Sequence, residues 1–184
     1  MKVESLAIAD VKLITPRKIG DDRGFFSETW NARAFADAGI GDTFVQDNQA
    51  MSGAKGTLRG LHFQTPPMAQ GKLVRVTRGS IFDVAVDVRR SSKTFGQHVS
   101  AVLSADNWQQ LWVPPGFAHG YCTLEANTEV MYKVTAFYSP AHDKGILWDD
   151  PELAIQWPVT RATAHLSEKD MMQPTLASAT ALFD

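Results

Sequence analysis

Short runs of alternating apolar and polar residues, separated by frequent turns, most limit what this chain of 184 residues can fold into. In residues 81–89 the even-numbered positions from Phe82 to Val88 are apolar, whereas Asp83 and Asp87 fall on the other face. An alternation with a period of two predicts a β-strand. The same reasoning predicts strands at 72–78 and 128–137, and shorter ones at 11–15, 25–28, 44–46, 57–64, 97–104, 109–114 and 120–124.

About ten short strands between polar turns, with little helix, predict an all-β fold, a jelly-roll β-barrel of the cupin type. We expect one helix at 32–38, capped by Asn31 and ended by Gly39, and a second short helix that begins at Ser167. No linker or repeat interrupts the chain, so we expect residues 1–184 to form a single domain. The mouth or interior of the barrel is the expected place for a site.

The composition excludes several classes of protein. Lys and Arg number 18 against 20 Asp and Glu, a net charge of −2, which argues against nucleic-acid binding. The single cysteine, Cys122, excludes an intramolecular disulfide framework. No apolar run is long enough to span a membrane, and residues 1–10 have no signal-peptide core, so we expect a cytoplasmic location.

A histidine in the strand at 57–64 is the first candidate for chemistry. His62 is a side chain that titrates near neutral pH, although a core histidine with one hydrogen bond is the plainer interpretation. Arg59 strengthens the functional interpretation, because a charge in a half-buried strand needs a partner or an anionic ligand. In a regular strand the two side chains would point to opposite faces, and a bulge at Gly60 would bring both inward.

A metal site is not expected, even though part of the sequence matches half of the cupin metal signature. His119 follows the turn Pro115-Gly116 at the spacing of that signature, but Gln64 stands where the second histidine of the other half belongs. Zinc, iron and manganese sites need three or four good ligands. The sequence therefore predicts no bound metal.

Other polar residues have both a functional and a structural interpretation. Tyr132 shares a strand face with apolar residues, where it either packs in the core or serves as a phenolic acid opposite a histidine base. Arg23 and Lys72 are either solvated charges or, together with Arg59, a cradle for a diphosphate. No glycine-rich phosphate loop is present, so side chains would have to hold any nucleotide.

Seven ordered blocks resemble the dTDP-4-dehydrorhamnose 3,5-epimerase family, and together they cover the chain from about residue 3 to residue 175. The blocks are DRGFF (22–26), FVQDN (44–48), LRGLHFQ (58–64), QGKLVR (70–75), FDVAVD (82–87), PGFAHG (115–120) and GILWDDP (145–151). The resemblance implies a metal-free jelly roll that forms homodimers and uses no cofactor. Residues 176–184 match least, and we expect them to fray or to lie on the partner subunit.

The resemblance also implies roles for individual residues. His62 would be the general base, oriented by Asp170, Tyr132 would be the general acid, and Lys72 would stabilise the enolate. The implied contacts with the substrate, dTDP-4-keto-6-deoxyglucose, are Arg23, Glu28, Gln46, Asn48, Arg59, His119, Asp143 and Lys169. Asp143 stands where the family often has glutamate, which keeps the charge and shortens the reach.

Four alternatives stay open at this stage. Within the fold, the chain could be an epimerase of one centre only, at C3 or C5, or a 3,4-ketoisomerase. From other classes, it could be a metal-dependent cupin oxygenase or a non-catalytic module that binds nucleotide sugars. Gln64 argues against the oxygenase, and a binding module would not need His62, Tyr132 and Asp170 together.

Overall fold

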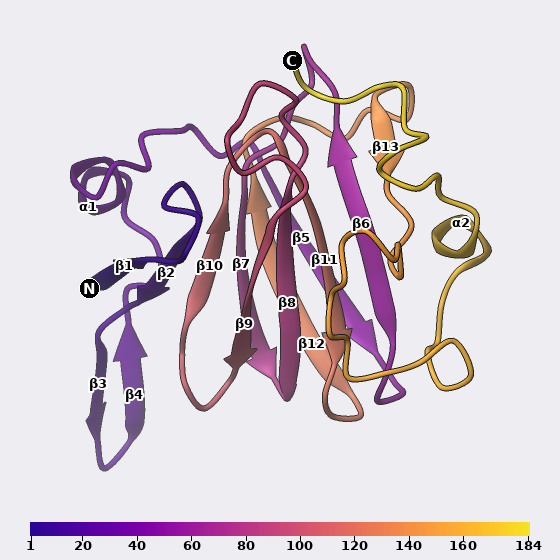
Figure 1. Cartoon of the computed structure of the whole chain (residues 1–184). Coiled ribbons are helices and arrows are strands. Elements are labelled where there is room, and N and C mark those ends of the chain that lie inside the picture. The colour runs from indigo at the N-terminus through magenta and orange to yellow at the C-terminus, as the bar shows by residue number, and fades with distance from the viewer.

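The computed structural model describes residues 1–184, and antiparallel strands make up most of it (Figure 1). A six-stranded sheet has the order β1-β2-β10-β7-β12-β5, with β1 at Lys2–Ser5, β2 at Lys12–Thr15, β10 at Gln110–Val113, β7 at Lys72–Arg78, β12 at Thr128–Val134 and β5 at Gln46–Ser52. A five-stranded sheet has the order β13-β6-β11-β8-β9, with β13 at Asp143–Gly145, β6 at Leu58–Gln64, β11 at Phe117–Thr123, β8 at Ser80–Asp87 and β9 at His98–Ser104. The remaining elements are a hairpin of β3 (Lys18–Asp21) and β4 (Gly24–Ser27) and the short helices α1 (Ala32–Asp37) and α2 (Glu168–Met171).

The two large sheets face each other across a shared apolar core. Val74 and Leu111 come to this core from the six-stranded sheet, and Leu103, Phe117 and Tyr121 come from the five-stranded sheet. This packing of two antiparallel sheets confirms the predicted all-β jelly roll. No helix is long and apolar enough to cross a bilayer.

Both outer faces of the sandwich are partly covered by other segments. Phe35 of α1 and Ile40 pack on the six-stranded sheet. Leu153 and Leu176 pack on the five-stranded sheet against Val84 of β8 and its neighbours. The apolar face of β8 is therefore the outer face, and its other face, with Asp83, points into the sandwich between the sheets.

The predicted strands are largely present, although β11 begins at Phe117 rather than 120 and β12 ends at Val134 rather than 137, and the largest differences occur at sheet edges. The alternation pattern does not reveal β1, β3 and β13, and it predicts only 44–46 where β5 runs from Gln46 to Ser52. Each missed strand has only three or four residues, and β5 alternates half-buried and exposed positions with polar residues on both faces. Hydrophobic patterning therefore gives little signal there.

Both predicted helices form with the expected caps. The side chain of Asn31 accepts a hydrogen bond from the backbone amide of Ala34, and Gly39, just past the end of α1, has a φ of +78°. The side chain of Ser167 caps α2 by accepting from the amide of Asp170. The cap at Ser167 fixes the start of α2, and therefore the position of Asp170 within its first turn.

The C-terminal segment differs from the expectation of a frayed end. Leu176 and Ala179 are buried against the five-stranded sheet of the same chain. The carbonyl of Phe183 accepts a hydrogen bond from the amide of Arg90. Leu176, Ala179, Leu182 and Phe183 pack on the sheet and dock this segment, although together they form no recognisable motif.

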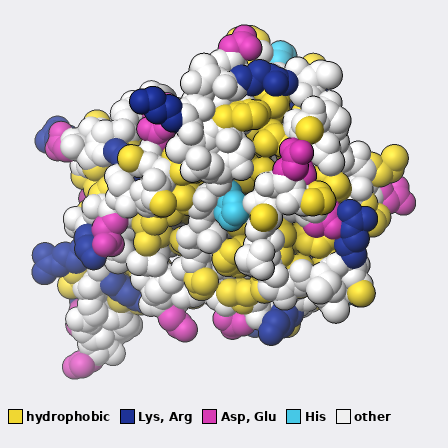
Figure 2. Space-filling view, in the orientation of Figure 1, with side chains coloured by type: hydrophobic (Ala, Val, Ile, Leu, Met, Phe, Trp, Pro, Cys, Tyr) yellow, Lys and Arg dark blue, Asp and Glu magenta, His cyan; other side chains and the backbone are white.

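The β3–β4 hairpin projects from the body of the sandwich, at the lower left of Figure 1. Figure 2 shows charged side chains on this projection and round the margin of the molecule, with more hydrophobic atoms over the centre of that face. Phe25 and Phe26 are nevertheless 54% and 70% exposed. At its base the hairpin is tied to the sandwich, because the indole of Trp108 donates to Ser27 and lies edge-on to Phe25.

A buried ion pair fastens the end of β8. The carboxylate of Asp87, whose side chain is fully buried, accepts two hydrogen bonds from the guanidinium of Arg89 and one each from the hydroxyls of Ser92 and Thr94. Burial alone would raise the pKa of Asp87, but these donors outweigh it and lower the pKa to about 2. Asp87 therefore contributes stability that is present above the pKa of an unfolded aspartate and is lost as the pH falls from about 4 to about 2.

We expect Asp87→Asn to lower the free energy of unfolding by about 2 kcal/mol at neutral pH. The neutral amide lacks the negative charge that the donors around Asp87 stabilise in the folded state. Urea unfolding at pH 7 and at pH 3 measures this difference, which should shrink at the lower pH. Asp106→Asn is the matched control, since Asp106 is exposed and makes no hydrogen bond. An equal loss of stability at both pH values would contradict this account.

Candidate active site

A cavity of about 440 Å³ lies between the two sheets, on the side that α2 covers. Seven of the twelve predicted site residues line it: Arg59, His62, Lys72, His119, Tyr132, Lys169 and Asp170. An adjoining cavity of about 290 Å³ shares His62, Lys72 and Tyr132 with the first. Three more predicted residues, Gln46, Asn48 and Asp143, line this second cavity.

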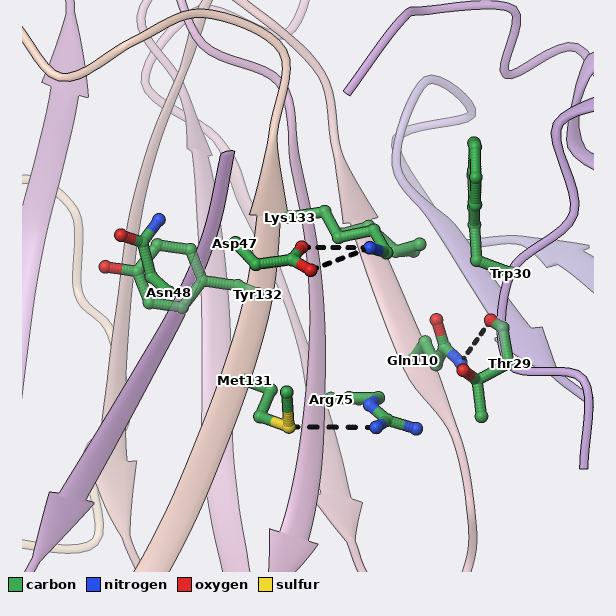
Figure 3. Close-up of a pocket in the computed structure, with 10 residues that line it drawn as sticks. Thr29, Trp30, Asp47, Asn48, Arg75, Gln110, Met131, Tyr132 and Lys133 are labelled. Atoms are coloured by element: carbon green, nitrogen blue, oxygen red, sulfur yellow. Dashed lines mark hydrogen bonds and ion pairs between the residues drawn. The ribbon is translucent and has the colours of Figure 1, made fainter. Parts of the chain in front are cut away.

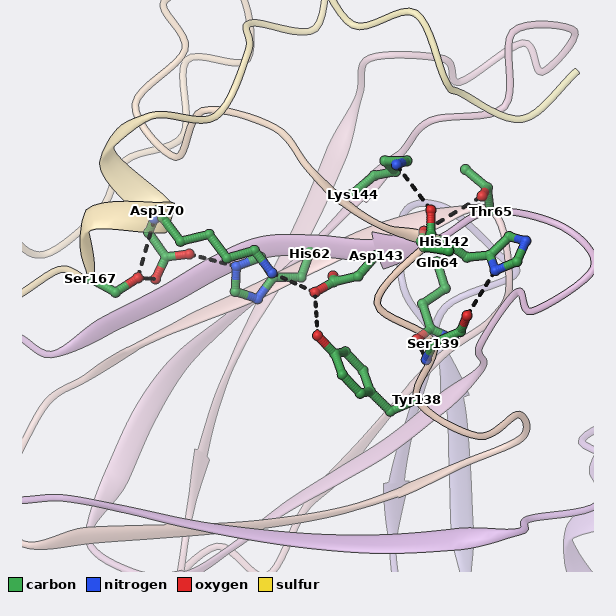
Figure 4. Close-up of polar contacts among 12 residues, drawn as sticks. His62, Gln64, Thr65, Tyr138, Ser139, His142, Asp143, Lys144, Ser167 and Asp170 are labelled. Carbon is green, nitrogen blue, oxygen red and sulfur yellow. Dashed lines mark hydrogen bonds and ion pairs between the residues drawn. The ribbon is translucent and has the colours of Figure 1, made fainter.

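His62 and Asp170 form a close pair at the wall of the larger cavity (Figure 4). The distance from Nε2 of His62 to Oδ1 of Asp170 is 2.5 Å, and the hydroxyl of Ser167 donates to the other carboxylate oxygen at 2.8 Å. Burial alone would raise the pKa of Asp170, but the contacts with His62 and Ser167 hold the pKa of this carboxyl below its ordinary value. The carboxylate therefore orients the ring and leaves Nδ1 as the nitrogen that makes no hydrogen bond within the chain.

A local irregularity in β6 brings Arg59 and His62 to the same side. His62 lies opposite His119 of β11, but Arg59 lies opposite Tyr121, so β6 has three steps where β11 has two. Such an extra residue reverses the facing of the strand beyond it, as the sequence analysis proposed for Gly60. A Cβ on Gly60, whose φ is +138°, would lie 2.5 Å from Cα of Gly120, so this close approach requires glycine.

Tyr132 enters the cavities from the opposite sheet to His62. His62 is on β6 of the five-stranded sheet, and Tyr132 is on β12 of the six-stranded sheet. Both residues line both cavities. Burial raises the pKa of Tyr132 above its ordinary value, against a smaller opposing effect of Arg59, so the phenol keeps its proton at neutral pH.

Two cations line the larger cavity with no carboxylate in contact. Lys72 is buried, and its ammonium donates only to the carbonyl of His62, at 3.3 Å. Burial lowers the pKa of Lys72 to about 8, and Asp143 and Asp83 partly offset this effect. The guanidinium of Arg59 makes only long hydrogen bonds, of 3.4–3.5 Å, to Ser52 and Met51. Unpaired positive charge in a cavity favours an anionic ligand.

Asp143 joins the wall of the smaller cavity to the larger one. Its carboxylate accepts hydrogen bonds from the ammonium of Lys169 and, at 3.1 Å, from the phenol of Tyr138 (Figure 4). Tyr138 was not predicted from the sequence, because it follows the end of β12 and shows no strand periodicity. Its position beside Asp143 comes from the return of the chain into β13.

The amides of the predicted site have different roles in the structure. Gln46 donates from its side chain to Asn48 at 2.8 Å, and both are on the half-buried face of β5. Gln64 is committed to the fold: its side chain donates to the carbonyls of Met68 and Phe137 and accepts from the amide of Ser139. No group of three or more His, Cys, Asp or Glu side chains is close enough to hold a metal ion.

The structure does not bring Arg23 and Glu28 into either of the two cavities that His62 lines. Arg23 is at the tip of the β3–β4 hairpin, where it pairs with Asp21 and its side chain is 90% exposed. Glu28 follows β4 and is also exposed. Their predicted contacts with a substrate therefore remain predictions.

A third, smaller cavity of about 130 Å³ lies on the other face of the six-stranded sheet (Figure 3). Asp47 and Lys133 pair there at 2.9 Å, while their chain neighbours Asn48 and Tyr132 point the other way. Gln110 donates to the carbonyl of Thr29 across this cavity. Because its charged pair is already satisfied, this cavity is a weaker candidate for a site.

Known proteins share this sequence pattern over most of the chain. Residues 5–178 match the family model described as dTDP-4-dehydrorhamnose 3,5-epimerase. A protein of that name from Sinorhizobium fredii is 58% identical over 180 residues, which are 96% of this chain and 90% of that protein.

Solved structures agree with this match. A dTDP-4-dehydrorhamnose 3,5-epimerase from Bacillus anthracis, with TDP and pyrophosphate bound, has a TM-score of 0.91 and 53% identity, and covers 95% of this chain and 98% of its own. An epimerase from Legionella pneumophila, in complex with dTDP-4-keto-L-rhamnose, has a TM-score of 0.93 and 45% identity, with coverage of 98% and 95%.

The jelly roll, the histidine–carboxylate pair and these relatives define the class of protein as a nucleotide-sugar epimerase, which is an enzyme. The chain belongs to the dTDP-4-dehydrorhamnose 3,5-epimerase family, as its sequence blocks suggested. This membership favours an isomerase over the oxygenase and the non-catalytic binding module.

Proposed function

We propose that the chain binds dTDP-4-dehydro-6-deoxy-D-glucose between its two sheets and inverts C3 and C5 of the sugar. The product is dTDP-4-dehydro-L-rhamnose, an intermediate of dTDP-L-rhamnose biosynthesis. The observation that carries the proposal is that His62, held by Asp170, and Tyr132 enter one cavity from opposite sheets. A base and an acid on opposite sides of a sugar ring are what inversion of a carbon centre requires.

His62 is the general base of this mechanism. The substrate's 4-keto group acidifies the C–H bonds at C3 and C5, so removal of either proton gives an enolate. The carboxylate of Asp170 accepts a hydrogen bond from the N–H at Nε2 of His62, which leaves the Nδ1 lone pair to remove the substrate proton. The same carboxylate stabilises the imidazolium that results.

Tyr132 and Lys72 complete the proton transfer. The phenol of Tyr132 delivers a proton to the face of the enolate opposite His62, and this return inverts the centre. The ammonium of Lys72 stabilises the negative oxygen of the enolate in a buried environment, where such electrostatic effects are strong. Each inversion moves protons with no net transfer of electrons, so the mechanism uses no redox cofactor.

The remaining residues of the two cavities hold the substrate. Arg59 provides an unpaired guanidinium for the diphosphate. Gln46, Asn48 and the Asp143–Lys169 pair border the smaller cavity, where they supply hydrogen bonds to the rest of the ligand. Binding energy from the nucleotide holds the sugar between base and acid.

A second copy of the chain completes the site in this proposal. An isolated two-stranded hairpin is marginally stable in water, and β3–β4 exposes Ile19, Phe25 and Phe26. Arg23 on the same hairpin lies outside the two cavities that His62 lines in its own chain. A homodimer in which each hairpin covers its partner would bury these apolar side chains and bring Arg23 and Glu28 to the partner's ligand. The expected location of this dimer is the cytoplasm.

We expect sedimentation equilibrium to give the mass of two chains at micromolar concentration. Phe26→Ser should weaken this association, because it removes a large apolar contact, while the fold seen by circular dichroism stays unchanged. Val102→Ser is the matched control, since Val102 is an exposed apolar residue on β9. A single-chain mass for the wild type would contradict the proposed dimer.

The reaction itself is tested in deuterium oxide with His62→Asn. The wild type should introduce deuterium at both C3 and C5, and the NMR spectrum of the product should have the L-rhamno configuration. His62→Asn should lower kcat by about 10²- to 10⁴-fold, because the base is lost, while dTDP still binds. His98→Asn, on β9 outside both cavities, is the control and should keep the wild-type rate. Deuterium at one centre only would favour the single-centre epimerase, and a 3-keto product would favour the ketoisomerase.

We expect kcat of the wild type to fall as the pH rises through about 8. Burial places the pKa of Lys72 near this value, so the ammonium loses its charge there, while the raised pKa of Tyr132 keeps the phenol protonated. Lys72→Arg keeps its charge at every accessible pH, so its alkaline limb should move upward even if its rate is lower. The hypothesis fails if the two pH profiles have the same alkaline limb.

A further inference from the structure

A second histidine–carboxylate pair borders the same cavity. Nε2 of His119 lies 2.6 Å from Oδ1 of Asp83. Asp83 is on β8 and His119 is on the neighbouring strand β11, and the Asp83 side chain is fully buried. The role of Asp83 is not covered by the mechanism above, which uses only His62 and Asp170 as a pair.

The Asp83 carboxylate is sealed away from any ligand. Its second oxygen, Oδ2, is buried and has no hydrogen-bond partner, and the same is true of the hydroxyl of Tyr121, which lies opposite Asp83 across the strands. A buried carboxylate with an unpaired oxygen lowers the stability of a fold. Residues that keep such a cost are commonly found at functional sites. Because Asp83 cannot touch a ligand, it can act only through His119.

The His119 ring does reach the cavity. It lines the larger cavity, and its Nδ1 makes no hydrogen bond within the chain. Since the carboxylate accepts a hydrogen bond from the N–H at Nε2, a neutral ring keeps its lone pair on Nδ1. A lone pair accepts a hydrogen bond from an O–H group, whereas a phosphate oxygen is itself an acceptor and gives no such contact.

His119 lies directly opposite His62 across the two strands. The same strand register that turns His62 inward therefore places two imidazoles side by side, each held at Nε2 by its own aspartate. In the proposed mechanism the sugar lies against His62, so the group that meets His119 belongs to the sugar rather than to the nucleotide.

We propose that Asp83 is a positioning residue, which fixes His119 with an Nδ1 lone pair toward the cavity so that it accepts a hydrogen bond from a sugar hydroxyl. This inference rests on the proposed function, because it takes the sugar to bind beside His62. Asp83 thus helps to orient the sugar for proton transfer, although Asp83 does not touch the sugar. Arg59 and Lys72 remain the groups for anionic oxygens.

Asp83→Asn tests the inference, because the amide can donate to the ring and select the opposite tautomer, as is known for the aspartate of serine proteases. We expect kcat/KM to fall by about 3- to 10-fold, the scale of a lost hydrogen bond between neutral groups. The Kd for dTDP should not change, because dTDP lacks the 4-keto-hexose whose hydroxyl meets His119. Nitrogen-15 NMR should show the His119 proton on Nε2 in the wild type and on Nδ1 in the variant.

A double-mutant cycle separates positioning from a general structural effect. In a His119→Gln background, Asp83→Asn should cause no further loss of kcat/KM, because the residue through which it acts is gone. Asp106→Asn is the control for substituting an aspartate elsewhere. Losses that multiply in the double variant, or a wild-type His119 proton on Nδ1, would overturn the inference, and the second result is decisive even if Asp83→Asn does not fold.

The same assays distinguish this inference from the proposed function. If the wild type fails to exchange C3 and C5 protons, the proposed function itself is wrong. If the wild type is active and Asp83→Asn matches it in kcat/KM, only the role of Asp83 is wrong.

Discussion

The contact between the backbones of Gly60 and Gly120 is the constraint on which the site depends. The two strands approach so closely there that a side chain at residue 60 would overlap Cα of residue 120. The extra residue that β6 carries at this point turns Arg59 and His62 to one side of the sheet. Without it the guanidinium and the imidazole would lie on opposite faces, and the cavity would have either its anion-binding group or its base but not both.

The site is built from residues of both large sheets. The five-stranded sheet supplies His62 and His119, and the six-stranded sheet supplies Lys72 and Tyr132. A sandwich holds its facing sheets about 10 Å apart, a spacing that leaves room for a flat sugar ring between groups on the two walls. Rigid strands fix these groups more firmly than loops would, which suits a reaction that needs an acid and a base on opposite faces.

Much of the fold and of the site could be predicted from the sequence, and the features that could not be predicted have physical reasons. The alternation in residues 81–89 predicted β8. It could not show which face of the strand points between the two sheets: Val84 lies on the outer face, under the C-terminal segment, and Asp83 points into the sandwich. The bulge at Gly60 could be proposed because two polar side chains would otherwise diverge. The pairing of Asp83 with His119 and of Tyr138 with Asp143 depends on the strand register and on a return of the chain, neither of which leaves a local pattern.

The position of α2 links the chemistry to the order in which the chain is made. Asp170 and Lys169 are in this short helix, and the segment that follows it is anchored by Leu176 and Ala179 against the sheet. Every strand of the sandwich precedes these residues in the sequence. A ribosome that has translated all thirteen strands has therefore produced the walls of the site, but the imidazole gains its carboxylate only when α2 emerges and docks.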